Sequence, residues 1–229
     1  MLRRIVLNLL SGLLLTLILC NSVFAQSEKK IAYGILIDNT ASLRSQLPEV
    51  LEISQGIVGR IHQQGPISLF NFTPEGNKRN QIAVVNSVAV QTQDKNLLDN
   101  YINQIFIVPG RTALMDAINS IAEQLNTKAS LDKDTFAEKV IYLVTDGEDR
   151  TSKIKEKQLT KALKESGIKV YAVGLIKELE NEGGYVQKSP KDKATDFLEK
   201  ITQETGGRVV FLKSKKDTVD GLLNKLFAK

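Results

Sequence analysis

The sequence has very few of the side chains on which many enzymes and most disulfide-stabilised proteins depend. Its 229 residues include one cysteine, one histidine and no tryptophan. The cysteine, Cys20, lies in the apolar N-terminal segment, so we expect a mature chain without a disulfide. With His62 as the only histidine, zinc hydrolase sites and Cys–His nucleophile pairs are excluded.

Two glycine-rich phosphate-binding motifs are absent as well. No Gly-x-x-x-x-Gly-Lys-Ser/Thr segment occurs, and no Gly-x-Gly-x-x-Gly follows the first apolar run. The formal net charge is only +5, and it falls to +3 without Arg3 and Arg4. A charge this small does not predict a nucleic acid partner.

The first 25 residues stand apart from the rest of the chain. Met1–Arg4 is a short basic start, and Ile5–Cys20 is almost wholly apolar. Val23 and Ala25 then supply small residues at the −3 and −1 positions before Gln26. This pattern is typical of a secretory signal peptide, so we predict cleavage after Ala25 and a secreted or periplasmic domain formed by residues 26–229.

Two other interpretations of this segment remain. The apolar run could stay uncleaved as an anchor, although it is short for a membrane span. A lipoprotein signal could use Leu17–Cys20, but bulky Leu19 stands where such signals have a small residue. No later stretch of the sequence is long and apolar enough to span a membrane.

Beyond residue 30, short apolar runs alternate with stretches of helical periodicity. The runs predict strands at Ile31–Ile37, Ile67–Phe72, Ile82–Val90, Val140–Val144, Val170–Ile176 and Val209–Leu212. The periodic stretches predict helices near Leu47–Ile61, Lys95–Phe106, Leu114–Leu125, Ile154–Glu165, Ala194–Ile201 and Val219–Phe227, with Asp38–Gln46 as a loop.

This alternation predicts an α/β fold: a doubly wound, mainly parallel sheet with helices on both faces, as in Rossmann-like domains. Too few residues separate the second and third strands for a helical crossover, so we expect an antiparallel hairpin there. We therefore place the third strand, Ile82–Val90, at an antiparallel edge of the sheet.

Oxygen-bearing side chains follow two of these strands. Asp38, Thr40 and Ser42 alternate directly after the first strand, and Asp146 follows the strand Val140–Val144. Thr112 lies in a turn before a helix, where it could also cap that helix. Ligands of open α/β sheets bind beyond the carboxyl ends of the strands, so these side chains are expected on one face. Oxygen donors alone suit a hard cation such as Mg²⁺, Mn²⁺ or Ca²⁺.

Three segments resemble the metal-ion-dependent adhesion site of von Willebrand factor type A (VWA) domains. Asp38–Ser42 matches the Asp-x-Ser/Thr-x-Ser pattern after the first strand, with Thr40 in the second position. Arg111–Ile118 resembles the threonine loop, and Leu143–Gly147 resembles the aspartate loop that follows the fourth strand. Their order and spacing agree with the family over about residues 30 to 229.

The resemblance implies a non-enzymatic protein that binds a divalent cation and, through it, an aspartate or glutamate carboxylate of a partner protein. It implies the metal ligands Asp38, Thr40, Ser42, Thr112 and Asp146. In some relatives the last helix shifts as the site opens and closes. Two residues depart from the pattern: Ala41 and Arg111 stand where glycines are common, and Arg111 could steer an acidic partner or simply reach solvent.

Other interpretations of the same residues stay open. Asp38, Thr112 and Asp146 could merely cap helices and turns. The ion could stabilise a scaffold without meeting a partner. An Mg²⁺-dependent phosphotransfer enzyme would also place an aspartate after the first strand, but Thr40 stands where a second aspartate is expected.

Further polar residues near the expected site also have more than one interpretation. The acids Asp116, Glu148 and Asp149 could solvate loops, cap helices or orient ligands. The polar loop Lys177–Asp192 could set specificity or be a tolerated insertion.

Overall fold

The structure is a computed structural model that describes residues 30–77, 80–131, 136–180, 188–214 and 216–228. The predicted signal peptide, residues 1–25, lies outside the described residues. The strands are β1 (Lys30–Ile37), β2 (Ile67–Glu75), β3 (Ile82–Thr92), β4 (Arg111–Thr112), β5 (Phe136–Thr145), β6 (Ile168–Gly174) and β7 (Val209–Phe211). The helices are the 3₁₀ helix η1 (Ala41–Gln46), α2 (Leu47–Ile61), α3 (Lys95–Asn103), α4 (Leu114–Leu131), α5 (Glu156–Glu165), α6 (Pro190–Glu204) and α7 (Val219–Leu226).

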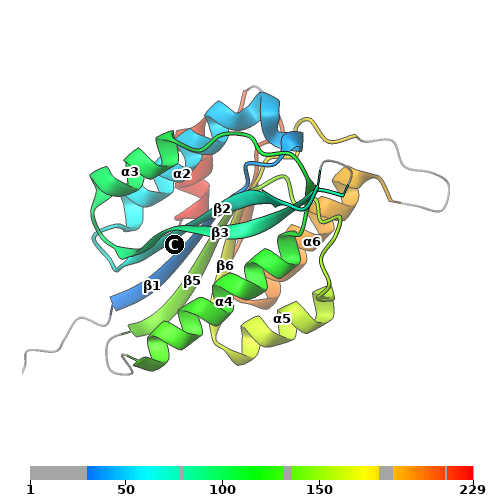
Figure 1. Ribbon diagram of the computed structural model, residues 1–229. Helices are drawn as coiled ribbons and strands as arrows, with labels where there is room; N and C mark the ends of the chain where they lie inside the picture. The colour runs from blue at the N-terminus through cyan, green and yellow to red at the C-terminus, as the bar shows by residue number, and fades with distance from the viewer. Residues whose placement is uncertain (1–29, 78–79, 132–135, 181–187, 215, 229) are drawn as a thin grey trace, which may run out of the picture.

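The strands form one sheet in the order β4-β3-β2-β1-β5-β6-β7 (Figure 1). All neighbouring pairs are parallel except β2 and β3, which confirms the predicted mainly parallel α/β sheet and its antiparallel hairpin. The predicted edge position of β3 is wrong, because β4 pairs with it at Ile82 and Ala83. A strand of only two residues, Arg111 and Thr112, is too short to show any periodicity in the sequence.

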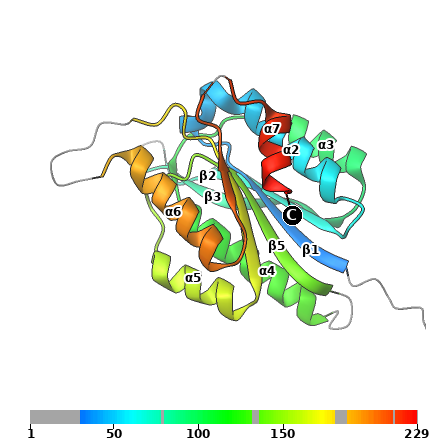
Figure 2. The same ribbon diagram turned by 180° about the vertical axis from the view of Figure 1, so that it is seen from behind.

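Helices cover both faces of the sheet, as predicted (Figures 1 and 2). One buried cluster joins the sheet to α2, α3 and α7, and it includes Ile35, Ile53 and Leu223. The other cluster joins the opposite face to α4, α5 and α6, and it includes Leu36 and Ile118. Successive β1 residues therefore enter opposite clusters, as the alternation of side chains along a strand requires. Both faces of β1 are buried, so its carboxyl end is fixed in place.

Several element boundaries differ from the prediction. Pro48 lies in the first turn of α2, as expected, but the end of the expected loop, from Ala41, is the 3₁₀ helix η1. Helix α3 ends at Asn103 and α5 begins only at Glu156. Among the described residues, none of the helices has both the length and the apolar character needed to cross a membrane.

Candidate functional site

The carboxyl ends of β1 and β5 bring Asp38 and Asp146 together. These strands are parallel neighbours with Ile37 opposite Val144, and the Asp38 amide donates to the Val144 carbonyl at 2.8 Å. Asp38 is 0% exposed and Asp146 is 1% exposed. Two carboxyl groups are thus buried side by side at the carboxyl ends of two neighbouring central strands.

Hydroxyl groups from two loops surround Asp38. Its Oδ1 accepts from the Thr40 amide at 3.0 Å and from Thr40 Oγ1 at 2.7 Å. Thr40 Oγ1 in turn lies 3.4 Å from Ser42 Oγ and accepts from Thr112 Oγ1 at 3.3 Å. The structure therefore gathers the hydroxyls of Thr40, Ser42 and Thr112 beside the Asp38 carboxyl.

Asp146 has one satisfied and one unsatisfied oxygen. Its Oδ1 accepts from the Glu148 amide at 2.9 Å, a turn that Gly147 permits with its φ of +81°. Its Oδ2 is buried and has no hydrogen-bond partner within the described part of the chain. A buried oxygen without a partner costs free energy, so its presence calls for an explanation.

Burial and mutual repulsion disfavour the ionised forms of the Asp38 and Asp146 carboxyl groups. Desolvation raises the pKa of Asp146 to about 7, the nearby Asp38 carboxyl adds to this rise, and the Ser42 hydroxyl and the Glu148 amide oppose it. Desolvation also raises the pKa of Asp38, although hydrogen bonds from Thr145 and Thr40 work against it. A cation between the two groups would remove this repulsion.

The donor set fits a hard divalent cation. All five predicted side chains offer oxygen, and the unpartnered Oδ2 of Asp146 is free to coordinate. The described residues hold no group of three or more histidine, cysteine, aspartate or glutamate side chains that could bind a metal. An ion held by the predicted ligands would meet two carboxylates and three neutral hydroxyls.

The three hydroxyl donors line a depression that is open to solvent. A depression of about 270 Å³ is lined by Thr40, Ala41, Ser42, Gly110, Thr112 and Arg150; we call it the mouth. Arg150 is the cation that lines it, whereas Arg111 is exposed and does not line it, which favours the solvent interpretation of Arg111. Arg111 and Thr112 are neighbours in β4, so their side chains point to opposite sides of the strand.

Arg150 is held in place at both its backbone and its side chain. Its amide donates to the Thr112 carbonyl at 2.9 Å. Its guanidinium pairs with Glu148 at 2.7 Å, although 56% of the side chain remains exposed. Glu148, whose role the sequence left open, thus forms an ion pair with Arg150 at the mouth.

The acids Asp116 and Asp149 fasten the loop after β5 to the start of α4. Asp149 Oδ1 accepts from the Met115 amide at 3.1 Å, and Asp116 accepts from the amides of Lys153 and Ile154, each at 2.9 Å. The contact of Asp149 matches the capping interpretation, whereas Asp116 holds amides of the loop that precedes α5. Thr112 does not cap α4, because the Met115 and Asp116 amides in its first turn donate to Asp149 and Ser152 instead.

Two polar residues of the site, Thr145 and Asn39, were not among the predicted site residues, because the sequence marks them less clearly than it marks the metal-binding motif. Thr145 donates to Asp38 Oδ2 at 2.7 Å and accepts from the Gly147 amide at 3.0 Å. Asn39 is 1% exposed; its Nδ2 donates to the carbonyls of Phe72 at 3.1 Å and Phe106 at 2.8 Å. The sequence signal for Asn39 was the alternation of side chains along an extended chain, which directs its side chain to the opposite side from those of Asp38 and Thr40.

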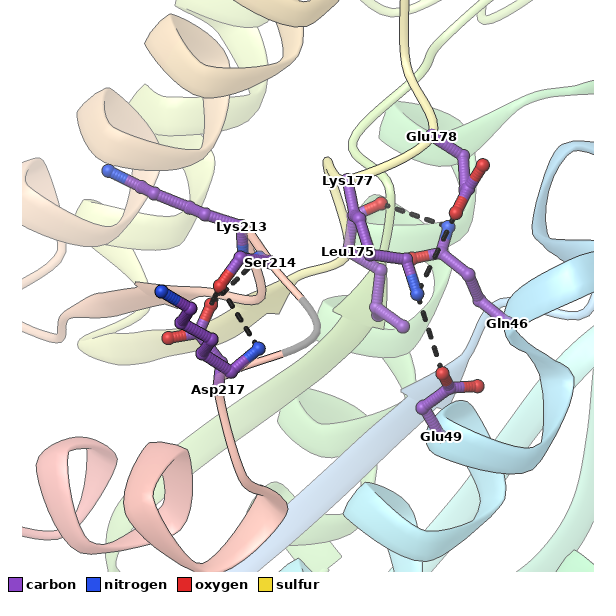
Figure 3. A network of polar contacts seen from close by, with 9 residues as sticks. Gln46, Glu49, Leu175, Lys177, Glu178, Lys213, Ser214 and Asp217 are labelled. Carbon is purple, nitrogen blue, oxygen red and sulfur yellow. Dashed lines mark hydrogen bonds and ion pairs between the residues drawn. The ribbon is translucent and has the colours of Figure 1, made fainter.

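A second network supports η1, the helix that carries Ser42 (Figure 3). The buried Gln46 donates from Nε2 to the Leu175 carbonyl at 3.4 Å, just after β6. Next to it, Lys177 pairs with Glu49 at 3.5 Å and with Glu178 at 3.6 Å. The start of the predicted loop Lys177–Asp192 therefore lies at this edge of the sheet, while residues 181–187 lie outside the described part.

The raised pKa of Asp146 predicts how stability changes with pH. The folded metal-free protein binds a proton at Asp146 up to about pH 7, whereas the unfolded chain loses it near 3.8. The folded state therefore binds more protons in this window, and the free energy of unfolding falls as pH rises from about 4 to 7. Chemical denaturation in chelator checks this. In Asp146→Asn the fall should be smaller, and an equal fall in both proteins would contradict the prediction.

Comparisons with known proteins were made for sequence and for structure. The family model described as "von Willebrand factor type A domain" matches residues 34–225. No curated protein matches the sequence. The solved structure of BatB, a conserved hypothetical protein of Bacteroides thetaiotaomicron, is similar at a TM-score of 0.58 and 15% identity, covering 86% of this chain and 96% of that one.

A second solved structure is the manganese-loaded TRAP protein of Plasmodium vivax, with a TM-score of 0.48 and 12% identity, covering 76% of this chain and 74% of that one. At 15% identity the likeness to BatB shows the fold alone, and the weaker likeness to TRAP adds nothing to it. The family model, however, matches most of the sequence, including the segments that contain all five predicted ligands. The chain therefore belongs to the von Willebrand factor type A domain family.

Proposed function

We propose that this protein binds one divalent cation, Mg²⁺ or its substitutes Mn²⁺ and Ca²⁺, and through it an acidic residue of a partner protein. The ligands would be Asp38, Thr40, Ser42, Thr112 and Asp146. The observation that carries the proposal is the unpartnered buried oxygen of Asp146 beside a hydroxyl-lined mouth. Segment 1–25 supports the further proposal that the interaction takes place outside the cytoplasm.

The composition of the donor set suits reversible binding of a carboxylate. When bound, the cation would supply a Lewis-acidic coordination position. Three neutral hydroxyls neutralise none of the ion's charge, so the ion would keep its attraction for an anionic ligand. Asp38 and Asp146 would offset only part of that attraction, and Arg150 adds a positive charge at the mouth.

The lining of the mouth supports a binding role over the phosphotransfer alternative. Its six residues include one ionisable side chain, Arg150, which cannot act as a base at neutral pH. His62 is at the far end of α2, where its Nδ1 lies 3.2 Å from the Val58 carbonyl. The openness of the mouth likewise supports partner binding over a purely structural ion, which would need no access to solvent.

A matched pair of peptides tests the proposal. Acetyl-Gly-Asp-Gly-amide should give saturation-transfer signals with the protein in Mg²⁺, because its carboxylate can complete the coordination shell. The signals should vanish in chelator and should be absent for acetyl-Gly-Asn-Gly-amide. Equal binding of both peptides, or binding of the aspartate peptide that is indifferent to Mg²⁺, would contradict it.

A further inference from the structure

Phe106 is the most exposed large apolar side chain in the described part of the chain. Its side chain is 71% exposed, against 48% for Val90 and 40% for Leu97. Single exposed apolar residues are common and carry little meaning alone. The position of Phe106, just before β4 and on the loop that leads to the mouth, distinguishes it from the other two.

A buried side chain fixes the backbone of Phe106 to the metal-site loop. Asn39 Nδ2 donates to the Phe106 carbonyl at 2.8 Å, and the Val108 amide donates to the Asn39 carbonyl at 2.9 Å. Thr40 and Val108 also form an isolated parallel bridge. The Phe106 backbone is therefore tied to the residue that lies between two of the proposed ligands, Asp38 and Thr40.

Phe106 lies between two buried residues, Ile105 directly before it and Val108 two positions after it, which further restricts the segment. Ile105 is 8% exposed and Val108 is 2% exposed, so the chain is anchored in the core before and after the exposed ring. A side chain held in this way loses little backbone freedom when a partner binds. Such preorganisation strengthens binding, because less conformational entropy is lost.

The mouth lies within a short distance of Phe106 along the chain. Gly110, four residues on, lines the mouth. Its φ is +120°, and a Cβ there would approach the Ile82 carbonyl carbon to 2.8 Å, so this stretch is packed tightly against β3. Four extended residues span at most about 14 Å. A peptide with its carboxylate in the mouth can therefore reach Phe106 within a few residues.

We infer that Phe106 and the mouth form one recognition surface for a segment of another protein that carries an acidic residue and, within four residues of it, a large apolar side chain. The inference rests on the proposed function and adds the chemistry of the partner. The mouth and Arg150 match the charge of the acid, and the fixed ring of Phe106 provides the apolar contact. An aromatic anchor next to a charged group is a common composition of binding hot spots.

A peptide series tests this inference separately from the proposed function. The reference is an acetylated Gly-rich peptide with one aspartate, and the series places a leucine one to four residues to either side of it. In Mg²⁺, at least one leucine peptide should bind about 10-fold more tightly than the reference, as expected for partial burial of a leucine side chain. Phe106→Ser should remove this gain and leave the reference affinity unchanged.

Leu97→Ser is the matched control, because it removes another exposed apolar side chain, on α3. It should keep the 10-fold gain. A gain that is absent, or that survives in Phe106→Ser, overturns the inference while the reference peptide still supports the proposed function. Loss of Mg²⁺-dependent binding of the reference itself overturns both. Self-association of the protein that disappears in Phe106→Ser would assign the surface to a second copy and overturn the inference.

Discussion

Replacing Asp146 by asparagine is expected to abolish the stabilisation of the protein by Mg²⁺ or Mn²⁺. In the unmutated protein, a metal concentration 100 times the dissociation constant adds about 2.7 kcal/mol to the free energy of unfolding. For a domain of this size that corresponds to a rise in melting temperature of about 5 to 10 °C. The Asp146→Asn protein lacks one of the two charges that we propose to hold the ion, so the rise should disappear.

The same substitution should stabilise the metal-free protein above pH 7. There Asp146 loses its proton and becomes a buried charge beside the Asp38 carboxyl without a counter-charge, and a neutral amide of the same shape avoids that charge. Thermal denaturation in chelator and in excess Mg²⁺ measures both effects. Asp220→Asn, the same change at an exposed position of α7, is the control and should keep the full metal response. A metal response that persists in Asp146→Asn would show that Asp146 is not a ligand.

Replacing Asn39 by alanine is expected to lower the free energy of unfolding by about 3 kcal/mol. Its side chain makes three hydrogen bonds: two from Nδ2 to the Phe72 and Phe106 carbonyls, and one from the Phe72 amide to Oδ1 at 2.8 Å. Alanine leaves these buried backbone groups without partners and opens a cavity. Because Asn39 lies between Asp38 and Thr40, metal affinity should fall as well.

Urea denaturation in chelator measures the loss of stability without any contribution from bound metal. Asn103→Ala is the matched control, since Asn103 is an exposed amide whose side chain accepts one bond, from Gln55 at 2.9 Å. It should cost less than about 1 kcal/mol. A loss in Asn39→Ala as small as in the control would mean that Asn39 does not hold the loops together.

The predictable part of the fold is the part that is buried on both faces. The strands β1 and β5 appear in the sequence as continuous apolar runs because helices cover them on either side. Their parallel pairing then places Asp38 and Asp146 at one edge of the sheet, as the register of Ile37 against Val144 shows. The proximity of Asp38 and Asp146 could therefore be predicted from the positions at which these two strands end.

Short elements could not be predicted in the same way. The strand β4 has two residues and η1 has six, so neither gives a period that can be counted. The edge position assigned to β3 was wrong for that reason. Contacts between distant loops were equally hidden: Arg150 reaches the mouth because its amide bonds to the Thr112 carbonyl, which no local pattern reveals.

The five metal ligands remain a prediction, which the contacts among their hydroxyl groups support. Thr112, Thr40 and Ser42 are linked through their hydroxyls, an arrangement that a set of independent helix caps would not require. The role of Asn39 was missed because the motif leaves its position unspecified and the alternation of side chains does not say what the asparagine would contact. Its role is visible only in the structure, where its side chain bonds to backbone groups of Phe72 and Phe106.

The most direct test of the account is a titration of the chelator-treated protein with Mn²⁺, followed by electron paramagnetic resonance and water-proton relaxation. We predict one saturable site per chain, lost in Asp38→Asn, with enhanced relaxation that acetyl-Gly-Asp-Gly-amide reduces by replacing coordinated water. Absence of saturable binding, or an affinity unchanged in Asp38→Asn, would contradict the assignment of the metal site. One site whose relaxation the peptide leaves unchanged would contradict the proposed binding of an acidic partner through the ion.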